Sequence, residues 1–228
     1  MSPSSALTRF LKQGLTRAMC PLCRVAHKLD REYIWYFFDE YSTDDQTLDA
    51  LRGARGFCLE HAAALRRLEV DGLKSTLGIS TTYLDTLEGL AEELARLRPK
   101  DYFTSAPCPA CAYRGDGLEK CARYLRDEMA ETERSRERYA EGPGLCMPHF
   151  ELVWSVATAE ERDFLIEVER RSVEGLVRDL REHICKQGAE FRSEPDGAEA
   201  GAWERALALT AGWPPPTAPV GRPEDDAA

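Results

Sequence analysis

Apolar residues recur with helical spacing along most of the chain. Leu7, Leu11 and Leu15 share one face of a first amphipathic helix, and Leu29, Tyr33 and Phe37 share one face of a second. No segment alternates apolar and polar residues for long enough to indicate a strand. We therefore predict an all-α fold, with helices over residues 4–18, 24–41, 47–52, 58–69, 73–97, 112–138, 146–157 and 158–186.

Two of these helices are long and carry apolar stripes of near-heptad spacing. The stripe of the first consists of Leu73, Leu77, Leu84, Leu87, Ala91 and Leu94. The stripe of the second consists of Ile166, Val173, Val177, Leu180 and Ile184. Thr158 and Glu161 form a capping box at the start of this second helix. Because such stripes are typical of helices that pack along their length, we expect the two helices to pack together in a pseudo-twofold arrangement.

The charge of the chain argues against nucleic acid as a partner. The formal net charge is −10, whereas a phosphate-binding surface needs clustered lysine and arginine. Between residues 119 and 138, six basic residues are matched by six acidic ones at helical spacings, as on a solvated helix face.

The hydropathy pattern indicates no membrane segment. No run approaches the ~18 apolar residues that a membrane-spanning helix needs. The N-terminus also lacks the apolar block of a signal peptide. We expect a cytoplasmic protein.

The cysteines and histidines reveal an internal duplication. A C-x-x-C pair and a C-x-x-H pair in the first half recur in the second half when 88 is added to each residue number. The first set is Cys20, Cys23, Cys58 and His61, and the second is Cys108, Cys111, Cys146 and His149. Pro21 and Pro109 follow the first cysteine of each set, and Gly56 and Gly144 stand two residues before the third. The chain therefore contains two copies of one structural unit.

Three cysteines and one histidine suit a closed tetrahedral zinc site. A C-x-x-C turn can place two sulfurs on one ion, and a C-x-x-H at an opening helical turn can supply the other two ligands. Calcium and magnesium would prefer oxygen ligands. We predict two structural zinc ions per chain, one bound by the ligand set of each half. An iron–sulfur cluster held by the same ligands is the alternative.

The other cysteines and histidines form no catalytic constellation. Cys121 is expected to be a small buried residue, since Tyr33 occupies its place in the first half. His183 and Cys185 lie near the end of the last long helix, where a cationic histidine suits the helix dipole. His27, one turn after the first C-x-x-C pair, is a candidate outer partner of the metal. The sequence has no G-x-S-x-G, P-loop, dinucleotide fingerprint or H-E-x-x-H motif.

The motifs CPLC, GFCLEH, CPAC and GLCMPH resemble those of an uncharacterised prokaryotic family with duplicated CPxC and CxxH pairs, a domain of unknown function. The resemblance covers about residues 7–185. It implies metal ligands at the eight positions of the repeat and supplies no activity. The second copy has Pro148 where the first has Glu60, which is compatible with a helix start. Arginine far exceeds lysine, as in proteins from GC-rich bacterial genomes.

We expect two zinc-binding repeats, over residues 1–99 and 100–187, and a mostly disordered acidic and proline-rich tail over 188–228. Within the tail, residues 198–211 can form a short helix anchored by Trp203, Leu207 and Trp213. We favour a latch that folds onto the chain's own core; a partner-binding motif is the alternative.

These features favour a non-enzymatic zinc-binding protein that acts as a protein-interaction or scaffold module, of unspecified oligomeric state. Two other functions stay open. One is a thiol-based redox or metal sensor that releases its ion on oxidation. The other is an enzyme with a pocket between the halves, built from Tyr33, Tyr36, His27 and Glu32.

Overall fold

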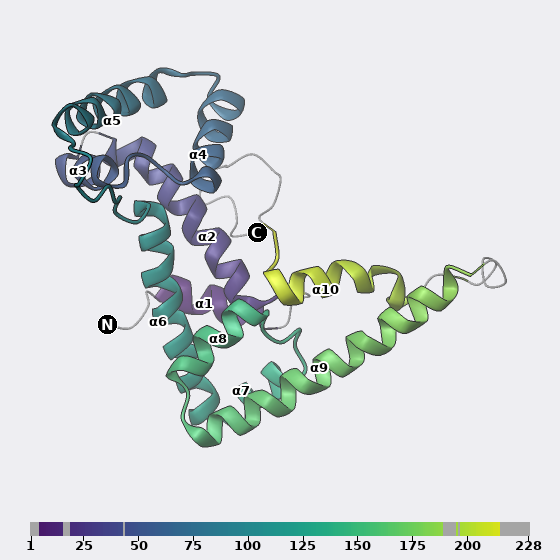
Figure 1. Cartoon of the computed structure of the whole chain (residues 1–228). Coiled ribbons are helices and arrows are strands. Elements are labelled where there is room, and N and C mark those ends of the chain that lie inside the picture. Colours follow the sequence, from purple (N-terminus) through teal and green to yellow (C-terminus); the bar gives the residue numbers. More distant parts are fainter. Residues whose placement is uncertain (1–4, 16–18, 43, 189–194, 196, 215–228) are drawn as a thin grey trace. The chain divides into compact units, whose positions relative to one another are not determined.

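The computed structural model describes residues 5–15, 19–42, 44–188, 195 and 197–214. These residues form helices and turns without a strand (Figure 1), which confirms the all-α prediction for this part of the chain. The chain divides into two compact units. Unit 1 contains the described residues up to Val25 and from Leu118 onward, and unit 2 contains Ala26–Gly117. Each unit therefore draws on both sequence repeats.

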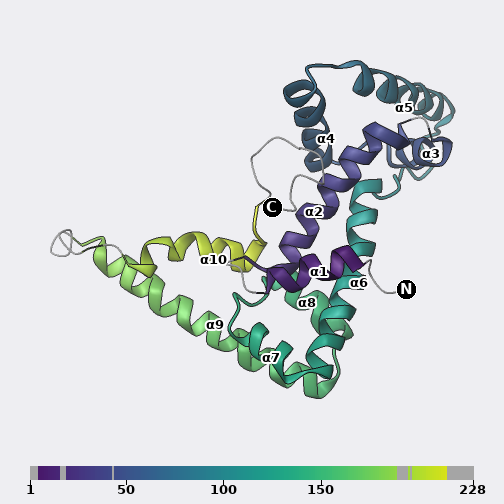
Figure 2. The same cartoon turned by 180° about the vertical axis from the view of Figure 1, so that it is seen from behind.

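Unit 1 is built mainly from amphipathic helices of the second repeat together with the start of the chain (Figures 1 and 2). Its elements are α1 (Ser5–Gly14), the start of α2 (Pro21–Tyr36), the end of α6 (Pro109–Glu131), α7 (Glu133–Ala140), α8 (Met147–Val156), α9 (Ala159–Lys186), η4 (Ala198–Gly201) and α10 (Ala202–Ala211). The predicted face of the first helix, Leu7, Leu11 and Leu15, is buried, as are Leu125 and Leu165.

Unit 2 surrounds an aromatic and aliphatic core. Its elements are the rest of α2, the π-helical turn η1 (Phe37–Tyr41), α3 (Asp45–Ala54), α4 (Leu59–Arg66), the π-helical turn η2 (Arg67–Gly72), α5 (Leu77–Arg96) and the first turns of α6. The buried core cluster consists of Ile34, Phe37, Leu51, Leu65 and Leu68. The aromatic run after residue 32 is thus helical, as its period predicts.

One predicted helix is interrupted. The helix expected over residues 112–138 ends at Glu131, and α7 begins at Glu133. Between them Thr132 has extended backbone angles, and its side chain accepts a hydrogen bond from the Ser135 N–H. Threonine is a good N-cap, but the charged helical pattern continues across this position, so periodicity alone did not reveal the break.

The two long helices bury less of their apolar stripes than predicted. Ile166 and Ile184 on α9 are exposed, and so are Leu77 and Leu84 on α5. The pseudo-twofold packing of these helices stays a prediction, since α5 and α9 belong to different units. None of the helices in the described residues has the length and hydropathy needed to cross a membrane.

The segment after α9 folds back onto unit 1. The short 3-10 helix η4 and α10 occupy the range 198–211, and α10 packs on α8 and α9 (Figure 1). Two ion pairs join this segment to α9, Lys186–Glu199 at 2.8 Å and Arg205–Asp179 at 2.8 Å. We call η4 and α10 the latch. Residues 189–194, 196 and 215–228 of the predicted tail, and residues 16–18 of the first predicted helix, lie outside the described residues.

The anchors predicted for the latch are wrong in two cases out of three. Trp203 and Leu207 are 50% and 62% exposed, whereas Ala202 and Ala208 are buried. Small alanine side chains allow α10 to approach its neighbours closely, and this places the larger apolar residues on the outer face. Trp213, just beyond α10, is half-buried, and its backbone contacts the site described next.

Candidate metal centres

The structure brings all eight repeated cysteines and histidines into two clusters, but not in the predicted sets. Cluster 1 consists of Cys20, Cys23, Cys146 and His149. Cluster 2 consists of Cys58, His61, Cys108 and Cys111. The prediction that each repeat supplies one complete ligand set is therefore wrong: the C-x-x-C of each repeat meets the C-x-x-H of the other. The physical reason lies in the helix packing, which places the starts of α2 and α8 together in unit 1 and the starts of α4 and α6 together in unit 2.

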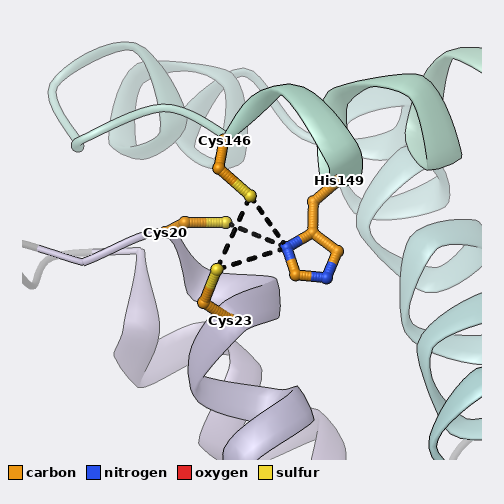
Figure 3. Close-up of side chains that lie close together, drawn as sticks. All are labelled: Cys20, Cys23, Cys146 and His149. Atoms are coloured by element: carbon orange, nitrogen blue, oxygen red, sulfur yellow. Dashed lines mark hydrogen bonds between the residues drawn. The ribbon is translucent and has the colours of Figure 1, made fainter. Parts of the chain in front are cut away.

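Cluster 1 is compact, with three buried cysteines and a half-buried histidine (Figure 3). The Nδ1 atom of His149 lies 3.1 Å from the sulfur of Cys146, 3.4 Å from that of Cys23 and 3.6 Å from that of Cys20. The sulfurs of Cys23 and Cys146 are 3.5 Å apart. All four ligand atoms point toward one common centre (Figure 3).

Cluster 2 repeats this geometry with greater exposure. The Nδ1 atom of His61 lies 3.1 Å from the sulfur of Cys58, 3.4 Å from that of Cys111 and 3.7 Å from that of Cys108. The sulfurs of Cys58 and Cys111 are 3.7 Å apart. The three cysteines are half-buried, while the cysteines of cluster 1 are buried.

These distances fit a single tetrahedral zinc ion. Zinc–sulfur and zinc–nitrogen bonds of about 2.3 and 2.05 Å imply tetrahedron edges of about 3.8 Å between sulfurs and about 3.5 Å between sulfur and nitrogen. The sulfur–sulfur separations of 3.5 and 3.7 Å and the sulfur–nitrogen separations of 3.1–3.7 Å lie close to these values. Each cluster thus has the size of a one-ion site.

All four motifs lie at helix N-termini. Cys58 and Cys146 are the N-caps of α4 and α8, and Cys20 and Cys108 each precede the first residue of α2 and α6. A helix start presents free N–H groups and a partial positive charge, which favour thiolates. Pro148 lies in the first turn of α8, where its missing N–H costs no helical bond.

The two repeated glycines lie in the turns just before Cys58 and Cys146. Gly56 and Gly144 have φ values of +102° and +72°, a region that side chains rarely adopt. A Cβ atom on Gly144 would also lie 2.7 Å from a carboxylate oxygen of Glu169. That carboxylate accepts hydrogen bonds from the Tyr139 hydroxyl at 2.6 Å and the Leu145 N–H at 2.8 Å. The glycine and the buried glutamate together fix the backbone conformation of the two residues that precede Cys146.

Hydrogen bonds among the ligand atoms spread the pKa values of the thiols. Donation from Cys20 and Cys23 lowers the pKa of Cys146, and the contact with Cys146 raises the pKa of Cys23. Burial raises the pKa of Cys108, but hydrogen bonds from His61 and backbone amides outweigh it and lower that pKa. Each cluster thus contains one sulfur that loses its proton readily, and binding of an ion displaces the remaining thiol protons.

Charged residues contact the histidine of cluster 2 and one another. The Nε2 atom of His61 lies 2.9 Å from Asp30 Oδ1, and Arg114 donates to Asp30 Oδ2 at 2.9 Å and to Glu60 at 3.3 Å. A carboxylate on the far nitrogen orients a ligand histidine and raises its basicity. The equivalents of the three charged residues, 88 positions away, are Leu118, Ala26 and Pro148. The two metal centres have therefore diverged in their surroundings while keeping the same ligands.

Replacing Asp30 by alanine is expected to weaken zinc binding at cluster 2 about 10- to 100-fold, because His61 loses the carboxylate that orients its ring. Cluster 1 in the same molecule should keep its affinity. The measurement is competition with a chromophoric chelator, which follows the two ions of each chain. Asp116→Ala, an exposed aspartate of the same unit, is the matched control. Equal weakening at both clusters, or none, would contradict the role given to Asp30.

Cluster 1 is covered by the two residues that follow the latch. The Trp213 N–H donates to the Cys23 sulfur at 3.4 Å, and Gly212, at φ +89°, lies against the sulfurs of Cys23 and Cys146. A cavity of about 260 Å³ adjoins this side of the cluster. Its lining includes Cys20, Cys146, Arg171, Ser172, Asp179, Arg205 and Leu209.

The remaining candidates occupy separate places. Cys121 is fully buried, as predicted, and Cys185 is exposed. A cavity of about 440 Å³ contains Tyr33 and Tyr36, which agrees with part of the predicted enzyme pocket. However, this cavity lies within unit 2, and its other lining residues are Asp44, Gln46, Thr47 and Tyr113 rather than His27 and Glu32.

Sequence reasoning missed the outer partner of cluster 2. It named only His27 as a candidate, next to Cys23 of cluster 1, and that role stays a prediction; in cluster 2 it is Asp30 that contacts the ligand histidine. Asp30 follows Cys23 by two helical turns on α2, and its equivalent is apolar. The sequence signal for this outer partner was a charged residue at a position that is apolar in the other repeat.

One family model, described as a family of unknown function (DUF6062), matches residues 14–216 of the chain. Neither the curated proteins nor the solved structures contain a match.

Proposed function

Because the chain belongs to DUF6062, a family of unknown function, we propose its function from the geometry of the two clusters. Each cluster holds one structural zinc ion, and the helical units that the ions stabilise bind another protein. The observation that carries the metal assignment is the spacing of the ligand atoms, all of which lie within 4.8 Å of one another in each cluster.

The spacing favours a single ion over an iron–sulfur cluster. An iron–sulfur cluster places several metal and sulfide atoms between the cysteines, so its ligand sulfurs must stand further apart than the edges of a one-ion tetrahedron. Zinc also accepts three thiolates and one imidazole without a preference imposed by its d electrons. Both points support zinc.

The ligand count favours a structural role. Three sulfurs and one nitrogen fill a tetrahedral coordination sphere and leave no position for water or substrate, as in other structural zinc sites. Each ion would join two helix starts that are distant in sequence, 123 residues apart for Cys23 and Cys146 and 53 for Cys58 and Cys111. Binding energy at such a site becomes folding energy.

Exposed apolar side chains support a protein partner. Large apolar residues stand on the outer faces of three helices, at 69% exposure for Ile184 and 73% for Leu77. Contiguous exposed apolar residues mark interaction surfaces. The net charge of −10 opposes a nucleic-acid partner.

Elemental analysis of protein purified without chelator tests the metal assignment. We expect two zinc ions per chain and no visible absorption band, because zinc has no d–d transitions. Iron with a visible chromophore would overturn the zinc assignment and make redox chemistry the leading function.

A thiol-based sensor is the second candidate, and the exposure of cluster 2 favours it. Cys58, Cys108 and Cys111 are half-buried, and oxidation of thiolates follows their exposure. A sensor releases its ion while the fold persists, whereas a structural site loses its ion together with the fold.

A further inference from the structure

Helix α5 packs against the core of unit 2 through Ile79, Thr82, Tyr83 and Thr86, and it turns a row of leucines outward. Thr82 and Thr86 are 4% and 2% exposed, whereas Leu77, Leu84 and Leu87 are 73%, 59% and 56% exposed. Leu94 continues the outer row at 51% exposure. These positions follow an a/d heptad pattern, in which Ser80 and Ala91 occupy the two remaining places. We call Leu77, Ser80, Leu84, Leu87, Ala91 and Leu94 the α5 stripe.

The rotation of α5 about its axis is fixed by polar contacts with neighbouring segments of unit 2. Arg52 on α3 donates to Asp85 at 2.7 Å, and Arg55 donates to Glu93 at 2.6 Å. The hydroxyl of Tyr83 accepts from a backbone N–H at 3.3 Å. At the helix start, the Glu69 carboxylate accepts from two backbone N–H groups, at 2.6 and 2.7 Å. The α5 stripe cannot turn inward without breaking these contacts, so its exposure is a property of the fold.

The charges of α5 are divided unevenly along the helix. Residues 77–84 carry no charged side chain, while residues 85–96 carry Asp85, Glu88, Glu92, Glu93 and Arg96. A parallel pair of α5 helices would bring two acidic halves together, whereas an antiparallel pair would place each acidic half beside a neutral one. Antiparallel helix dipoles also attract.

The α5 stripe is complementary to itself in the antiparallel sense. With a positions opposite d positions, Leu84 of one copy lies opposite Leu87 of the other, and Leu77 opposite Leu94. In the same register Ser80 lies opposite Ala91, so large residues face large ones and small residues face small ones. Such a symmetric contact uses one surface on both copies, as a twofold dimer requires.

We propose that the α5 stripe is a dimerisation surface, on which a second copy of this chain docks its own α5 in antiparallel orientation. The proposal deepens the protein-binding half of the proposed function and rests on that half alone, not on the zinc assignment. Because a single helix pair is a small interface, we expect a dissociation constant on the order of tens of micromolar.

Sedimentation velocity of the full-length, zinc-loaded chain at about 1–200 μM tests the proposal. Wild-type protein should shift from monomer to dimer across this range. Leu84→Glu and Leu87→Lys should each raise the dissociation constant at least 30-fold, as expected for central interface residues. An equimolar mixture of the two variants should dimerise again. In the antiparallel register the new glutamate at position 84 of one variant faces the new lysine at position 87 of the other. The unchanged Leu87 of the first variant then faces the unchanged Leu84 of the second.

Each other outcome overturns the proposal. A wild-type monomer at 200 μM rejects self-association, and a dimer in either single variant places the contact elsewhere. A mixture that stays monomeric rejects the antiparallel register. Val173→Glu, on the apolar stripe of α9, is the control and should dimerise like wild type. The pair Leu77→Glu and Leu94→Lys repeats the test if a first variant misfolds. Zinc counts on the same samples separate a failed dimer from a failed metal site.

Discussion

A double variant with Cys23→Ser and Cys146→Ser is expected to retain one zinc ion per chain, whereas a Cys23→Ser, Cys58→Ser variant is expected to retain none. The first pair belongs to cluster 1 and leaves cluster 2 complete. The second pair removes one thiolate from each cluster, and a site with three ligands left binds zinc far more weakly than a closed tetrahedral one. Elemental analysis after dialysis against a mild chelator gives the count.

This comparison distinguishes the two ways of pairing the motifs. If each repeat bound its own ion, the outcomes would be reversed, with one zinc ion left in the Cys23→Ser, Cys58→Ser variant. The double variant Cys121→Ser, Cys185→Ser carries the same number of substitutions outside both clusters and should retain two ions.

Removal of both zinc ions is expected to unfold both units. A structural zinc site contributes on the order of 10 kcal/mol, which is comparable to the roughly 5–15 kcal/mol of stability in an ordinary domain. We expect a large loss of helical circular dichroism at 222 nm and no cooperative melting once a strong chelator has taken both ions. Re-addition of zinc, but not of magnesium, should restore the signal.

The order of zinc loss carries further information. Cluster 2 should release its ion to a chelator first, since its cysteines are half-buried while those of cluster 1 are buried. Unit 2 should lose its helices with that ion if the site is structural. Reversible release at cluster 2 on oxidation, with the helices retained, would instead favour the sensor. A zinc-free chain that stays folded and melts cooperatively would contradict the structural role of both ions. Cys185→Ser, which lacks the exposed thiol, should behave like wild type throughout.

The ligands could be predicted from the sequence, but their pairing could not. Both motif pairs have the same residue types, so either pairing gives two sets of three cysteines and one histidine. Loop closure favours pairing within a repeat, because Cys58 follows Cys23 by 35 residues and Cys146 follows it by 123. Yet the difference in loop-closure entropy is only about 1 kcal/mol, which is small beside the energy of a zinc site. The packing of α2, α4, α6 and α8 therefore decides the pairing.

The positions of the helices along the chain were likewise predictable, but which face of each helix is buried was not. The period of the apolar residues located α5 and its stripe of leucines. Which face turns inward depends on contacts between distant residues, such as Arg52 with Asp85 and Arg55 with Glu93. The latch shows the same limit: periodicity predicts a helix over 198–211, but close packing through Ala202 and Ala208 leaves Trp203 outside.

The crossed pairing also determines when each site can close during synthesis. Cluster 2 is complete once Cys111 has been added, and cluster 1 only after His149. At translation rates of about 5–20 residues per second, these 38 residues take about 2–8 s. Before Cys108 emerges, the nascent chain offers only the four ligands of the first repeat, which can trap an ion in a non-native set. The folding chain must give up such an ion before both native centres form, so zinc supply in excess of need would slow its maturation.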